Sequence, residues 1–423
     1  MDTLTWPKDA DLGSPRDPLR QPDIRAFAVQ DVEIGPAGTC LNGTQLSIYQ
    51  SFEECERLWR TAVETCSCFV FQTFEWHSTW YATIGKAEVV RAYIVHLADD
   101  TGRTLQILPL GIYWRKGLRF LCFLGGIVTD YNVPLIDREF ASNISKREFS
   151  SLWRSILDLL PRVDVVWLQR MPDTIEGTRN PMITLVGTQH TENAHAAVLP
   201  ADLATFKARR STKLFSDNRR RRRRLSEKGR IDVSIPVVPA DAVETLETMA
   251  RQKSRRWRES GGRDLFALPG YLQFYKILTN TSFQTGSVHI SCLRLNGRML
   301  ATHWGLAFKE RFYWLMPGYQ AGEWTRYSVG RLLLENVVEW CISEQMSVFD
   351  LTVGDESFKF DWADHSLALY EHLDRRSVKG ALFVAAYRFR ARLKQDPRIR
   401  SFVRFSKARL KAVSAKSIRC LGR

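Results

Sequence analysis

Two carboxylates and an amine stand close together in the second half of the chain. The apolar run 347–351 predicts a strand, and Asp355, Glu356 and Lys359 come directly after it. A carboxylate with a raised pKa can take the proton of an attacking amine, and adjacent acids push the pKa of one of them upward. Asp355 or Glu356 is therefore our candidate for a general base. Lys359 is placed either to hold an anionic group of a ligand or to pair with one of the two acids.

A turn suited to an anion precedes this strand. The segment around Gly330 leads into an apolar-periodic run, which predicts that a helix begins there. A glycine at a helix start lets a ligand approach the backbone, and the free N–H groups of the first turn attract a group such as a pyrophosphate. The candidate cofactor-binding residues are Ser328, Val329, Gly330, Arg331 and Leu332.

His303 is a further candidate for catalysis. It lies in the predicted strand 298–308, next to Trp304. A neutral imidazole can accept a proton at physiological pH. A single histidine inside a strand is more often a structural residue, so both interpretations stay open.

Candidate substrate-binding residues lie in both halves. The polar, glycine-rich segment 125–132 is flanked by predicted strands and either lines a cleft or forms a tight turn. The other candidates lie near the end of the predicted helix 241–259, where basic residues also interact favourably with the helix dipole. These candidates are Asp130, Tyr131, Asn132, Arg256 and Trp257.

The second half is predicted to form an antiparallel meander followed by a helix and a strand. Runs that alternate apolar and polar residues lie at 287–295, 298–308 and 311–317, and Asn296-Gly297 between the first two is a strong hairpin signal. The first half has the same order. Its strand-like runs lie at 89–98, 104–114, 119–123 and 163–168, with a helix at 146–160. This repetition predicts a duplicated α/β architecture.

Four short motifs accompany these elements. In the second half they read Tyr327-Ser328-x-Gly330-x-Leu332-Leu333 and Phe349-Asp350-x-x-x-Gly354-Asp355-Glu356-x-Phe358-Lys359-x-x-Trp362. In the first half they read Phe71-Gln72-Thr73-x-Glu75-Trp76 and Leu124-Gly125-Gly126-x-x-x-Asp130-Tyr131-Asn132. Together they resemble the CelD-type branch of the GNAT acyltransferases, known from cellulose biosynthesis, whose relatives include the FemAB-like aminoacyl transferases. The resemblance covers roughly residues 45–375.

The resemblance implies an α/β (α+β) fold with two tandem GNAT-like (acyl-CoA N-acyltransferase) units. Each unit would be a mixed, mostly antiparallel sheet flanked by helices. We expect an N-terminal GNAT-like domain at 29–200 and a C-terminal one, which carries the acyltransferase motif, at 201–375. Composition adds a disordered leader at 1–28 and a basic amphipathic tail at 376–423.

The resemblance also implies a reaction. The enzyme would transfer an acyl group from acyl-CoA, either acetyl-CoA or a longer one, to an amine or hydroxyl of a sugar or polysaccharide precursor in exopolysaccharide or cellulose assembly. A carboxylate would act as the base, and no metal would take part. In the FemAB-like relatives the donor is aminoacyl-tRNA, which is the alternative. A third hypothesis is a non-catalytic protein with a degenerate GNAT fold that recruits partners to a membrane.

A run of arginines dominates the first of two strongly basic segments. Residues 207–230 hold twelve Lys or Arg against two acids, out of a net charge of +15 for the chain. The six consecutive arginines from Arg219 to Arg224 encircle a helix, because successive side chains turn by about 100°. Such a helix is either solvated or in contact with phosphates of a coenzyme or of tRNA.

The tail is the second basic segment. Residues 375–423 hold sixteen Lys or Arg against one acid, and Leu382, Ala386, Phe389 and Leu393 have helical spacing. A basic amphipathic helix of this kind is typical of proteins that bind an anionic membrane surface. Packing on the second domain and binding to RNA are the alternatives.

The remaining composition excludes several classes. Eight cysteines without a Cys-x-x-Cys pair or a nearby His cluster argue against structural zinc and for reduced thiols. No Gly-x-Ser-x-Gly, P-loop, Rossmann or His-Glu-x-x-His motif occurs, so covalent hydrolases, NTPases and metalloproteases are not expected. No secretory signal or bilayer-spanning segment is apparent. We expect a cytoplasmic protein, located at the inner face of the membrane if the tail binds there.

Overall fold

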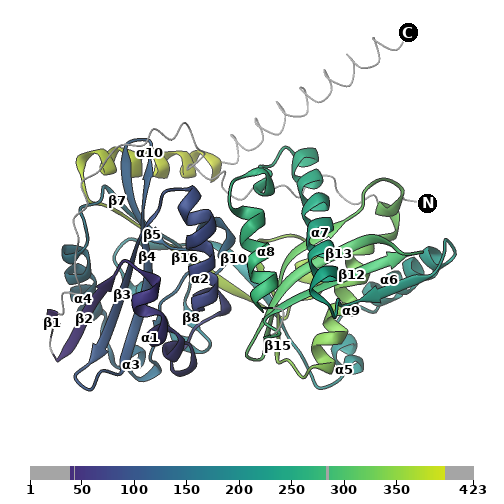
Figure 1. Ribbon diagram of the computed structural model, residues 1–423, viewed down its shortest axis with the longest axis horizontal. Coiled ribbons are helices and arrows are strands. Elements are labelled where there is room, and N and C mark those ends of the chain that lie inside the picture. Colours follow the sequence, from purple (N-terminus) through teal and green to yellow (C-terminus); the bar gives the residue numbers. More distant parts are fainter. Residues whose placement is uncertain (1–38, 42, 283–284, 396–423) are drawn as a thin grey trace, which may run out of the picture.

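The computed structural model describes residues 39–41, 43–282 and 285–395. The predicted leader at 1–28 and residues 396–423 of the predicted tail lie outside these ranges. In the described part, the chain forms two units that lie side by side, each with helices packed on part of one large sheet (Figure 1).

The first unit contains an antiparallel meander followed by a helix and a parallel strand, as predicted. The strand pair β4–β5 turns at Lys116-Gly117, where both residues have positive φ. The elements are β1 (Thr39–Leu41), β2 (Thr44–Tyr49), α1 (Phe52–Thr65), α2 (Phe74–Trp80), η2 (Tyr81–Gly85), β3 (Arg91–Asp99), β4 (Thr104–Arg115), β5 (Leu118–Phe123), β6 (Leu135–Ile136), α3 (Arg138–Asn143), α4 (Lys146–Leu159), β7 (Val165–Pro172), β8 (Thr174–Ile175), β9 (Thr178–Arg179) and β10 (Thr188–Val198).

The second unit repeats this order, and its hairpin signal is confirmed. Asn296 and Gly297 both have positive φ and join two strands that pair antiparallel. The elements are α5 (Leu203–Ala208), α6 (Thr212–Ser226), β11 (Ile231–Ser234), α7 (Pro239–Ser260), α8 (Tyr271–Ser282), β12 (Val288–Leu295), β13 (Arg298–Phe308), β14 (Arg311–Tyr319), η6 (Gly322–Tyr327), α9 (Val329–Ser343), β15 (Val348–Val353), η7 (Lys359–Asp361), β16 (His365–Arg375) and α10 (Val378–Gln395).

Apart from β8 and β9, which form a separate two-stranded sheet, the described strands of both units form one continuous sheet. In the described residues it has 14 strands in the order β1-β2-β3-β4-β5-β7-β16-β10-β15-β14-β13-β12-β11, with β6 paired to β4. Only β5–β7 and β14–β15 are parallel pairs, and the other pairs are antiparallel. The predicted mixed, mostly antiparallel α/β fold is therefore confirmed, but the two units share a sheet.

The last strand of each unit lies beside the other unit. β10 ends the first unit along the chain and pairs with β15 of the second. β16 follows the second unit and pairs with β7 of the first. The two exchanged strands also pair with each other, so they form the centre of the sheet. Neither strand was foreseen from the sequence.

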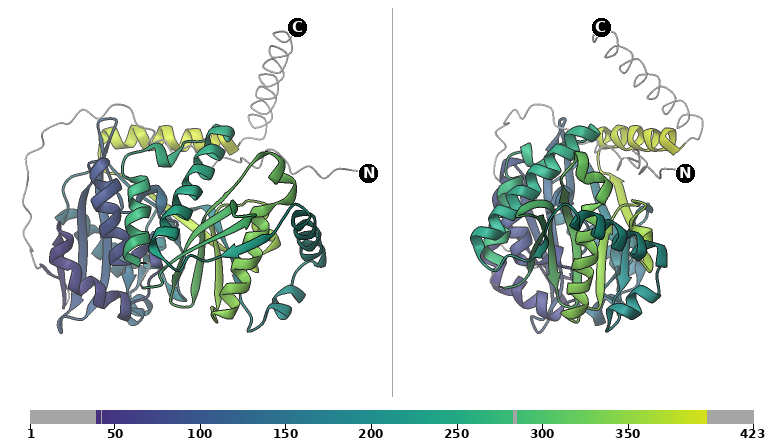
Figure 2. Two further views of the ribbon diagram at one scale, coloured as in Figure 1. Left: turned by 45° about the vertical axis from the view of Figure 1, so that its right-hand side comes forward. Right: turned by 90° about the vertical axis from the view of Figure 1, so that its right-hand side faces the viewer.

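Helices cover both faces of this sheet (Figure 2). The largest buried cluster combines α1 and α2 of the first unit with α7 and α8 of the second. On the opposite face α4 packs on the first unit, and α5, α6 and α9 pack on the second. The arginine-rich helix α6 buries Leu214, Phe215, Asn218 and Leu225 against this second unit.

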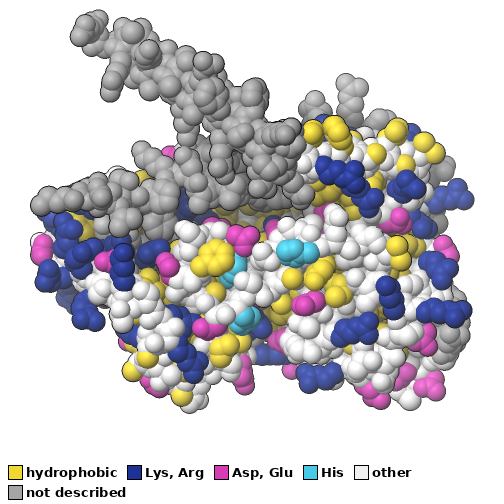
Figure 3. Space-filling view, turned by 180° about the vertical axis from the view of Figure 1, so that it is seen from behind, with side chains coloured by type: hydrophobic (Ala, Val, Ile, Leu, Met, Phe, Trp, Pro, Cys, Tyr) yellow, Lys and Arg dark blue, Asp and Glu magenta, His cyan; other side chains and the backbone are white. Residues whose placement is uncertain are grey.

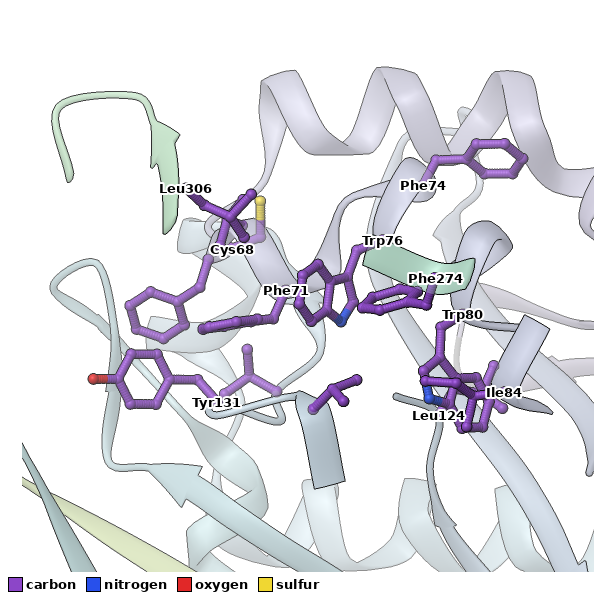
Figure 4. Close-up of a cluster of buried hydrophobic side chains, with 14 of the residues drawn as sticks. Cys68, Phe71, Phe74, Trp76, Trp80, Ile84, Leu124, Tyr131, Phe274 and Leu306 are labelled. Atoms are coloured by element: carbon purple, nitrogen blue, oxygen red, sulfur yellow. The ribbon is translucent and has the colours of Figure 1, made fainter. Parts of the chain in front are cut away.

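An aromatic core joins the two units (Figure 4). The ring of Trp76 on α2 lies 4.9 Å from that of Phe274 on α8, and Phe71 lies 5.4 Å from Tyr313 on β14. Gly270 has φ +84° just before α8, and a Cβ there would lie 2.7 Å from the carbonyl oxygen of Thr83. The backbones approach so closely at this point that only glycine fits.

The first part of the predicted tail is the helix α10, which packs on β7 and β16. Phe383 contacts the ring of Phe120 at 5.0 Å between centroids, and Tyr387 donates a hydrogen bond to Glu371 (2.9 Å). Leu382 and Phe389, which belong to the predicted apolar stripe, are 70% and 62% exposed. The helix therefore packs with one side and leaves the predicted stripe in contact with solvent.

Candidate active site

The two parallel strands of the second unit pair over only a short distance. β14 and β15 run in register over three residue pairs, and the register ends at Tyr313 and Asp350. At the same level β13 and β14 shift register between Trp304 and Leu306 of β13, which is a bulge that re-aims the strand. The strands therefore part towards the carboxyl end of β15.

The residue that begins α9 is strained. Ser328 has φ +48° and ψ +47°, in the left-handed region that residues other than glycine seldom occupy. Its carbonyl oxygen accepts hydrogen bonds from the amides of Arg331 (2.8 Å) and Leu332 (3.2 Å). The amides of Val329 and Gly330 precede the first bonded amide, that of Arg331, and the first amides of a helix have no intrahelical acceptor.

The five candidate cofactor-binding residues form this single turn, but their side chains differ. Val329 and Leu332 are buried in the core, so only their backbone can meet a ligand. The nearest atom to a Cβ built on Gly330 is a ring carbon of Tyr319 at 3.5 Å, so the backbone is open on that side. The N–H groups of the first turn are thus the part of the turn that suits a pyrophosphate.

A partly buried guanidinium lies beside this turn. α6 packs against η6 and α9. Nη1 of Arg221 on α6 is buried and has no hydrogen-bond partner in the described part of the chain. Burial lowers the pKa of Arg221, and the nearby charge of Arg331 adds to this effect. Arg331 itself pairs with Asp361 at 3.0 Å. An unpaired buried N–H is costly, and an anionic ligand would satisfy it.

The two adjacent acids after β15 turn in different directions. Asp355 accepts a hydrogen bond from Nε2 of His195 on β10 at 2.8 Å. Glu356 pairs with Nζ of Lys359 at 3.0 Å. Both carboxylate side chains are about half exposed, at 54% and 49%. The sequence suggested a coupled pair of acids, but the structure gives each acid its own partner.

Lys359 is buried and holds the end of β15. Its ammonium group donates to the carbonyl oxygens of Thr352 (3.1 Å) and Val353 (2.7 Å) besides pairing with Glu356. Thr352 has φ +59°, so the strand bends at this point. Of the two placements that the sequence left open for Lys359, the structure shows the ion pair.

A second charged cluster comes from the first unit. Nη1 of Arg170, just before the end of β7, lies 3.2 Å from Asp130, and its Nε lies 3.4 Å from Glu192 on β10. Burial raises the pKa of the Asp130 carboxyl and of the Glu192 carboxyl, while Arg170 opposes the shift in both. A carboxylate with a raised pKa is the better proton acceptor near neutral pH.

Lys253 on α7 links this cluster to the acids of the second unit. Burial lowers the pKa of Lys253 to about 8, and the charge of Arg256 acts in the same direction. The carboxylates of Glu356 and Asp130 raise this pKa, because both lie within electrostatic reach of the ammonium group. Asp130 and Glu356 therefore both act electrostatically on Lys253.

The other two candidates in the first-unit segment make structural contacts. The hydroxyl of Tyr131 donates to Asp350 at 2.7 Å, and the amide side chain of Asn132 donates to the carbonyl oxygen of Gln169 at 3.0 Å. Both residues are buried. The segment therefore fixes the first unit against the second and presents Asp130 to the charged cluster.

Arg256 and Trp257 lie near the end of α7. The guanidinium of Arg256 lies 5.2 Å from the ring centre of Tyr319, beside the turn before α9. Trp257 packs on Phe266 with ring centres 5.4 Å apart and is partly buried. Arg256 is thus near the proposed ligand, whereas Trp257 belongs to the core.

His303 lies apart from these acids in an aromatic layer. Its ring stacks on Trp314 at 3.8 Å and lies 5.9 Å from His289. The side chain is fully buried, and in the described residues neither ring nitrogen has a hydrogen-bond partner. Burial holds the pKa of His303 well below its usual value. We therefore leave His303 out of the proposal below.

The sequence of the second unit matches a known family. Residues 212–360 match the family described as acetyltransferase (GNAT) domain. The second unit carries a GNAT-type acetyltransferase domain. The protein is accordingly an acyltransferase, and the turn before α9 together with the parting of β14 and β15 belongs to this domain. No curated protein matches the chain.

Solved structures are similar in fold at low identity. FemX has a TM-score of 0.53 at 10% identity, covering 76% of this chain and 96% of FemX. The protein L-PGS from Bacillus licheniformis has a TM-score of 0.47 at 14% identity, with 84% of this chain and 98% of that chain covered. A tandem GNAT protein from the clavulanic acid biosynthesis pathway has a TM-score of 0.43 at 9% identity, with 78% and 99% covered. The likeness to FemX shows the fold alone.

Several residues of the site were missed from the sequence. Glu192 and His195 come from the exchanged strand β10, and only the fold brings them to the second unit. Lys253 lies three residues before Arg256, which was a candidate, but nothing in the sequence shows that it is buried. In the described residues no group of three or more potential ligand side chains could hold a metal ion.

Proposed function

We propose that this acyltransferase moves an acyl group from acyl-CoA to an amine or hydroxyl of a sugar or polysaccharide precursor. The observation that carries the donor assignment is the turn at Ser328–Leu332 beside the unpaired Nη1 of Arg221. Helix-terminal amides and a guanidinium together suit a pyrophosphate. The acceptor class rests on the CelD-type resemblance of the four motifs.

The place where β14 and β15 part is a second feature that suits an acyl-CoA donor. A bound acyl-CoA supplies a thioester carbonyl that an amine or hydroxyl can attack. Backbone groups of β14 beyond Tyr313 are no longer paired with β15, so they can bind the extended arm of such a donor. Arg256, whose guanidinium lies 5.2 Å from the ring centre of Tyr319, supplies a further positive charge that an anionic donor can meet.

The residues near the end of β15 are placed to handle the acceptor's proton. Asp130 has the raised pKa that a base needs, and Glu356 lies in the same charged group around Lys253. Lys359 fixes the chain that carries Glu356 by binding two carbonyl oxygens of β15. We assign proton acceptance to Asp130 or Glu356, with Lys253 contributing positive charge near the reacting carbonyl.

Release of free thiol from acyl-CoA in the presence of amino sugars tests this proposal. Asp130→Asn and Glu356→Gln separate the two candidate bases, and the variant of the true base should lose about 10²–10⁴-fold in turnover. Asp232→Asn on the exposed side of β11 removes a carboxylate far along the sheet and serves as the matched control. If no acyl-CoA binds in calorimetry and no thiol is released, the proposal is wrong.

An aminoacyl-tRNA donor is the alternative that one observation favours. Lys and Arg side chains gather at the edge of the molecule formed by α6 (left in Figure 3). A shallow groove of about 700 Å³ there is lined by Arg219, Arg222, Arg223, Ser226, Gly229, Arg230 and Ile231. Such a groove suits a polyphosphate backbone. Copurification of tRNA that is lost steeply as salt is raised would support this donor, and its absence at low salt would exclude it.

The predicted contact with a membrane stays a proposal. Among the described residues no helix has an apolar stretch long enough to cross a membrane. The exposed side of α10 combines Leu382 and Phe389 with the basic residues Arg390 and Arg392. This combination fits a helix that lies on an anionic surface, and we propose peripheral attachment through it.

A further inference from the structure

A serine, a histidine and an aspartate are hydrogen-bonded in series at the centre of the sheet. Oγ of Ser366 on β16 lies 2.9 Å from Nδ1 of His195 on β10. Nε2 of His195 lies 2.8 Å from Oδ1 of Asp355, which follows β15. In the ladder His195 is opposite Ser366 on one side and Thr352 on the other. The exchange of strands between the two units thus creates this series.

The partners of the imidazole fix its proton. An ionised carboxylate can only accept, so Nε2 of His195 carries the hydrogen that Asp355 receives. Nδ1 of the neutral ring is then an acceptor, and the Ser366 hydroxyl is the donor. Asp355 also accepts a longer hydrogen bond from Asn193 at 3.4 Å, which steadies the carboxylate. The series therefore has the direction of a hydroxyl, a base and a carboxylate that orients the base.

The surroundings suit a nucleophile. The His195 side chain is only 2% exposed, whereas Ser366 is exposed to solvent. Phe360 lies against the imidazole with ring centres 4.6 Å apart and is 59% exposed itself. The buried imidazole can act as a base, and the exposed hydroxyl of Ser366 can reach an activated ester. The exposed ring of Phe360 offers an apolar surface to the acyl group of that ester. A hydrogen-bonded serine that only joined strands would not need the carboxylate behind the histidine.

We propose that Ser366 is a nucleophile towards activated acyl esters and thioesters, with His195 as its base and Asp355 as the positioning residue. Oγ bonds to the acyl carbon while its proton moves to Nδ1 of His195. The bond between the acyl carbon and the leaving oxygen or sulfur breaks, and that atom takes the proton from His195. Water then attacks the acyl-serine by the same route and releases the acid. This activity goes beyond the proposed transfer, and it uses neither Glu356 nor the turn before α9.

The proposal differs from the sequence-based expectation, and the difference has a physical reason. The absence of a Gly-x-Ser-x-Gly motif argued against a covalent hydrolase. A hydrogen-bonded series of this type is defined by geometry and not by sequence order. Here 171 residues separate Ser366 from His195 and 160 separate His195 from Asp355, so only the sheet brings them together.

Labelling of the full chain with a fluorophosphonate probe, followed by peptide mapping, tests the proposal. The probe's phosphorus should bond to Oγ of Ser366 with loss of fluoride, and His195→Gln should slow this labelling at least about 100-fold. Two matched controls are His372→Gln, a buried histidine on β16 whose Nδ1 lies 3.2 Å from the hydroxyl of Thr188, and Ser343→Ala, an exposed serine bonded to a carbonyl oxygen. Both should label Ser366 at the wild-type rate.

A second test replaces Ser366 by cysteine. It does not depend on a loss of activity, which a misfolded variant would also show. The thiol of Ser366→Cys should react with iodoacetamide at pH 6.5 at least about tenfold faster than the same thiol in the double variant with His195→Gln. Hydrolysis of p-nitrophenyl acetate should fall to background in Ser366→Ala. An unlabelled Ser366 in the wild-type protein, or equal rates with and without His195, would overturn the proposal. Loss of acyl-CoA binding would leave these results unchanged, so the two proposals can fail separately.

Discussion

The hydroxyl of Tyr131 in the first unit lies 2.7 Å from Oδ1 of Asp350 in the second. Oδ2 of the same carboxylate accepts from Arg311 at 2.9 Å, and the backbone amide of Thr352 binds Oδ1 at 2.8 Å. Asp350 is fully buried in the strand whose pairing with β14 ends at this residue. One carboxylate thus connects the glycine-rich segment of the first unit to the point where the parallel strands of the second unit part.

Removing the hydroxyl of Tyr131 should destabilise the whole protein. In Tyr131→Phe a buried charged acceptor loses one of its donors, which should lower the free energy of unfolding by about 1–3 kcal/mol. Urea denaturation followed by tryptophan fluorescence measures the change. Tyr370→Phe, a partly exposed residue on β16, should change stability by less than about 0.5 kcal/mol. Equal effects of the two substitutions would show that the contact between the units contributes nothing.

Relief of strain at Ser328 should stabilise the protein. Glycine adopts φ +48° without a penalty, so Ser328→Gly should raise the free energy of unfolding by about 0.5–1 kcal/mol. Ser343→Gly is the control, because Ser343 ends α9 in helical conformation and glycine should destabilise it by up to about 1 kcal/mol. The melting temperatures of both variants, measured by thermal unfolding, test this prediction. A lower melting temperature for Ser328→Gly would mean that its side chain makes contacts that outweigh the strain.

The lowered pKa of Lys253 should be visible in a titration. Reductive ¹³C-methylation should give one lysine signal with a pKa near 8. Substitution of Glu356 or Asp130 by its amide removes a negative charge and should lower this pKa further, whereas Arg256→Met should raise it. A signal that titrates only near 10.5 in the wild-type protein would contradict the burial of this amine.

The same shift predicts the pH dependence of stability. The pKa of Lys253 is lower in the folded state than in the unfolded state, so the unfolded state binds the proton more tightly. The resulting destabilisation is complete below about pH 8 and disappears as the pH rises towards 10.5. Lys253→Met should be more stable than the wild type at pH 7 and should differ less from it at pH 10.

Buried neutral histidines should make the protein sensitive to acid. Burial lowers the pKa of His77 to about 3 and that of His289 to about 3. The unfolded state therefore takes up these protons first, and stability falls as the pH drops from 6.5 towards 3, by about 1.4 kcal/mol per pH unit for each histidine. His77→Leu should show a shallower fall. If both proteins unfold at the same pH, His77 is not buried in its neutral form.

The exposed stripe of α10 should bind anionic vesicles. Phe389→Ser together with Leu382→Ser should reduce cosedimentation with phosphatidylserine-containing vesicles at least about tenfold, because each removes apolar area that would enter the interface. Leu268→Ser near α8 alters a partly buried residue away from α10 and serves as a control for general loss of stability. Unchanged binding of the double variant would leave the helix without a membrane role.

The elements that the sequence predicted well are those set by local signals. Asn296-Gly297 fixes a hairpin without reference to the rest of the chain, and apolar periodicity marks α4, α7 and β12 to within a few residues. The turn around Gly330 was located for the same reason, since a helix start is a local event.

The exchanged strands could not be predicted in this way. Residues 188–198 read Thr-Gln-His-Thr-Glu-Asn-Ala-His-Ala-Ala-Val, which is too polar for an ordinary central strand, and their partners lie more than 150 residues away. The polar side chains are there because they carry charge and hydrogen bonds at the junction: Glu192 pairs with Arg170, and His195 with Asp355. Strand prediction from apolar periodicity therefore misses β10, because its functional residues Glu192 and His195 are polar.

The position of β16 also has a consequence for how this chain is made. Among the strands that the structure describes, β16 leaves the ribosome last, yet it lies in the middle of the sheet, between β7 and β10. Until it arrives, β7 is an open edge with apolar side chains, and such edges attract other chains. A chain that stopped before residue 365 would therefore lose more than a terminal strand, because β7 would keep β5 on one side and have no partner on the other. We therefore expect a chain without β16 to aggregate more readily than the full chain.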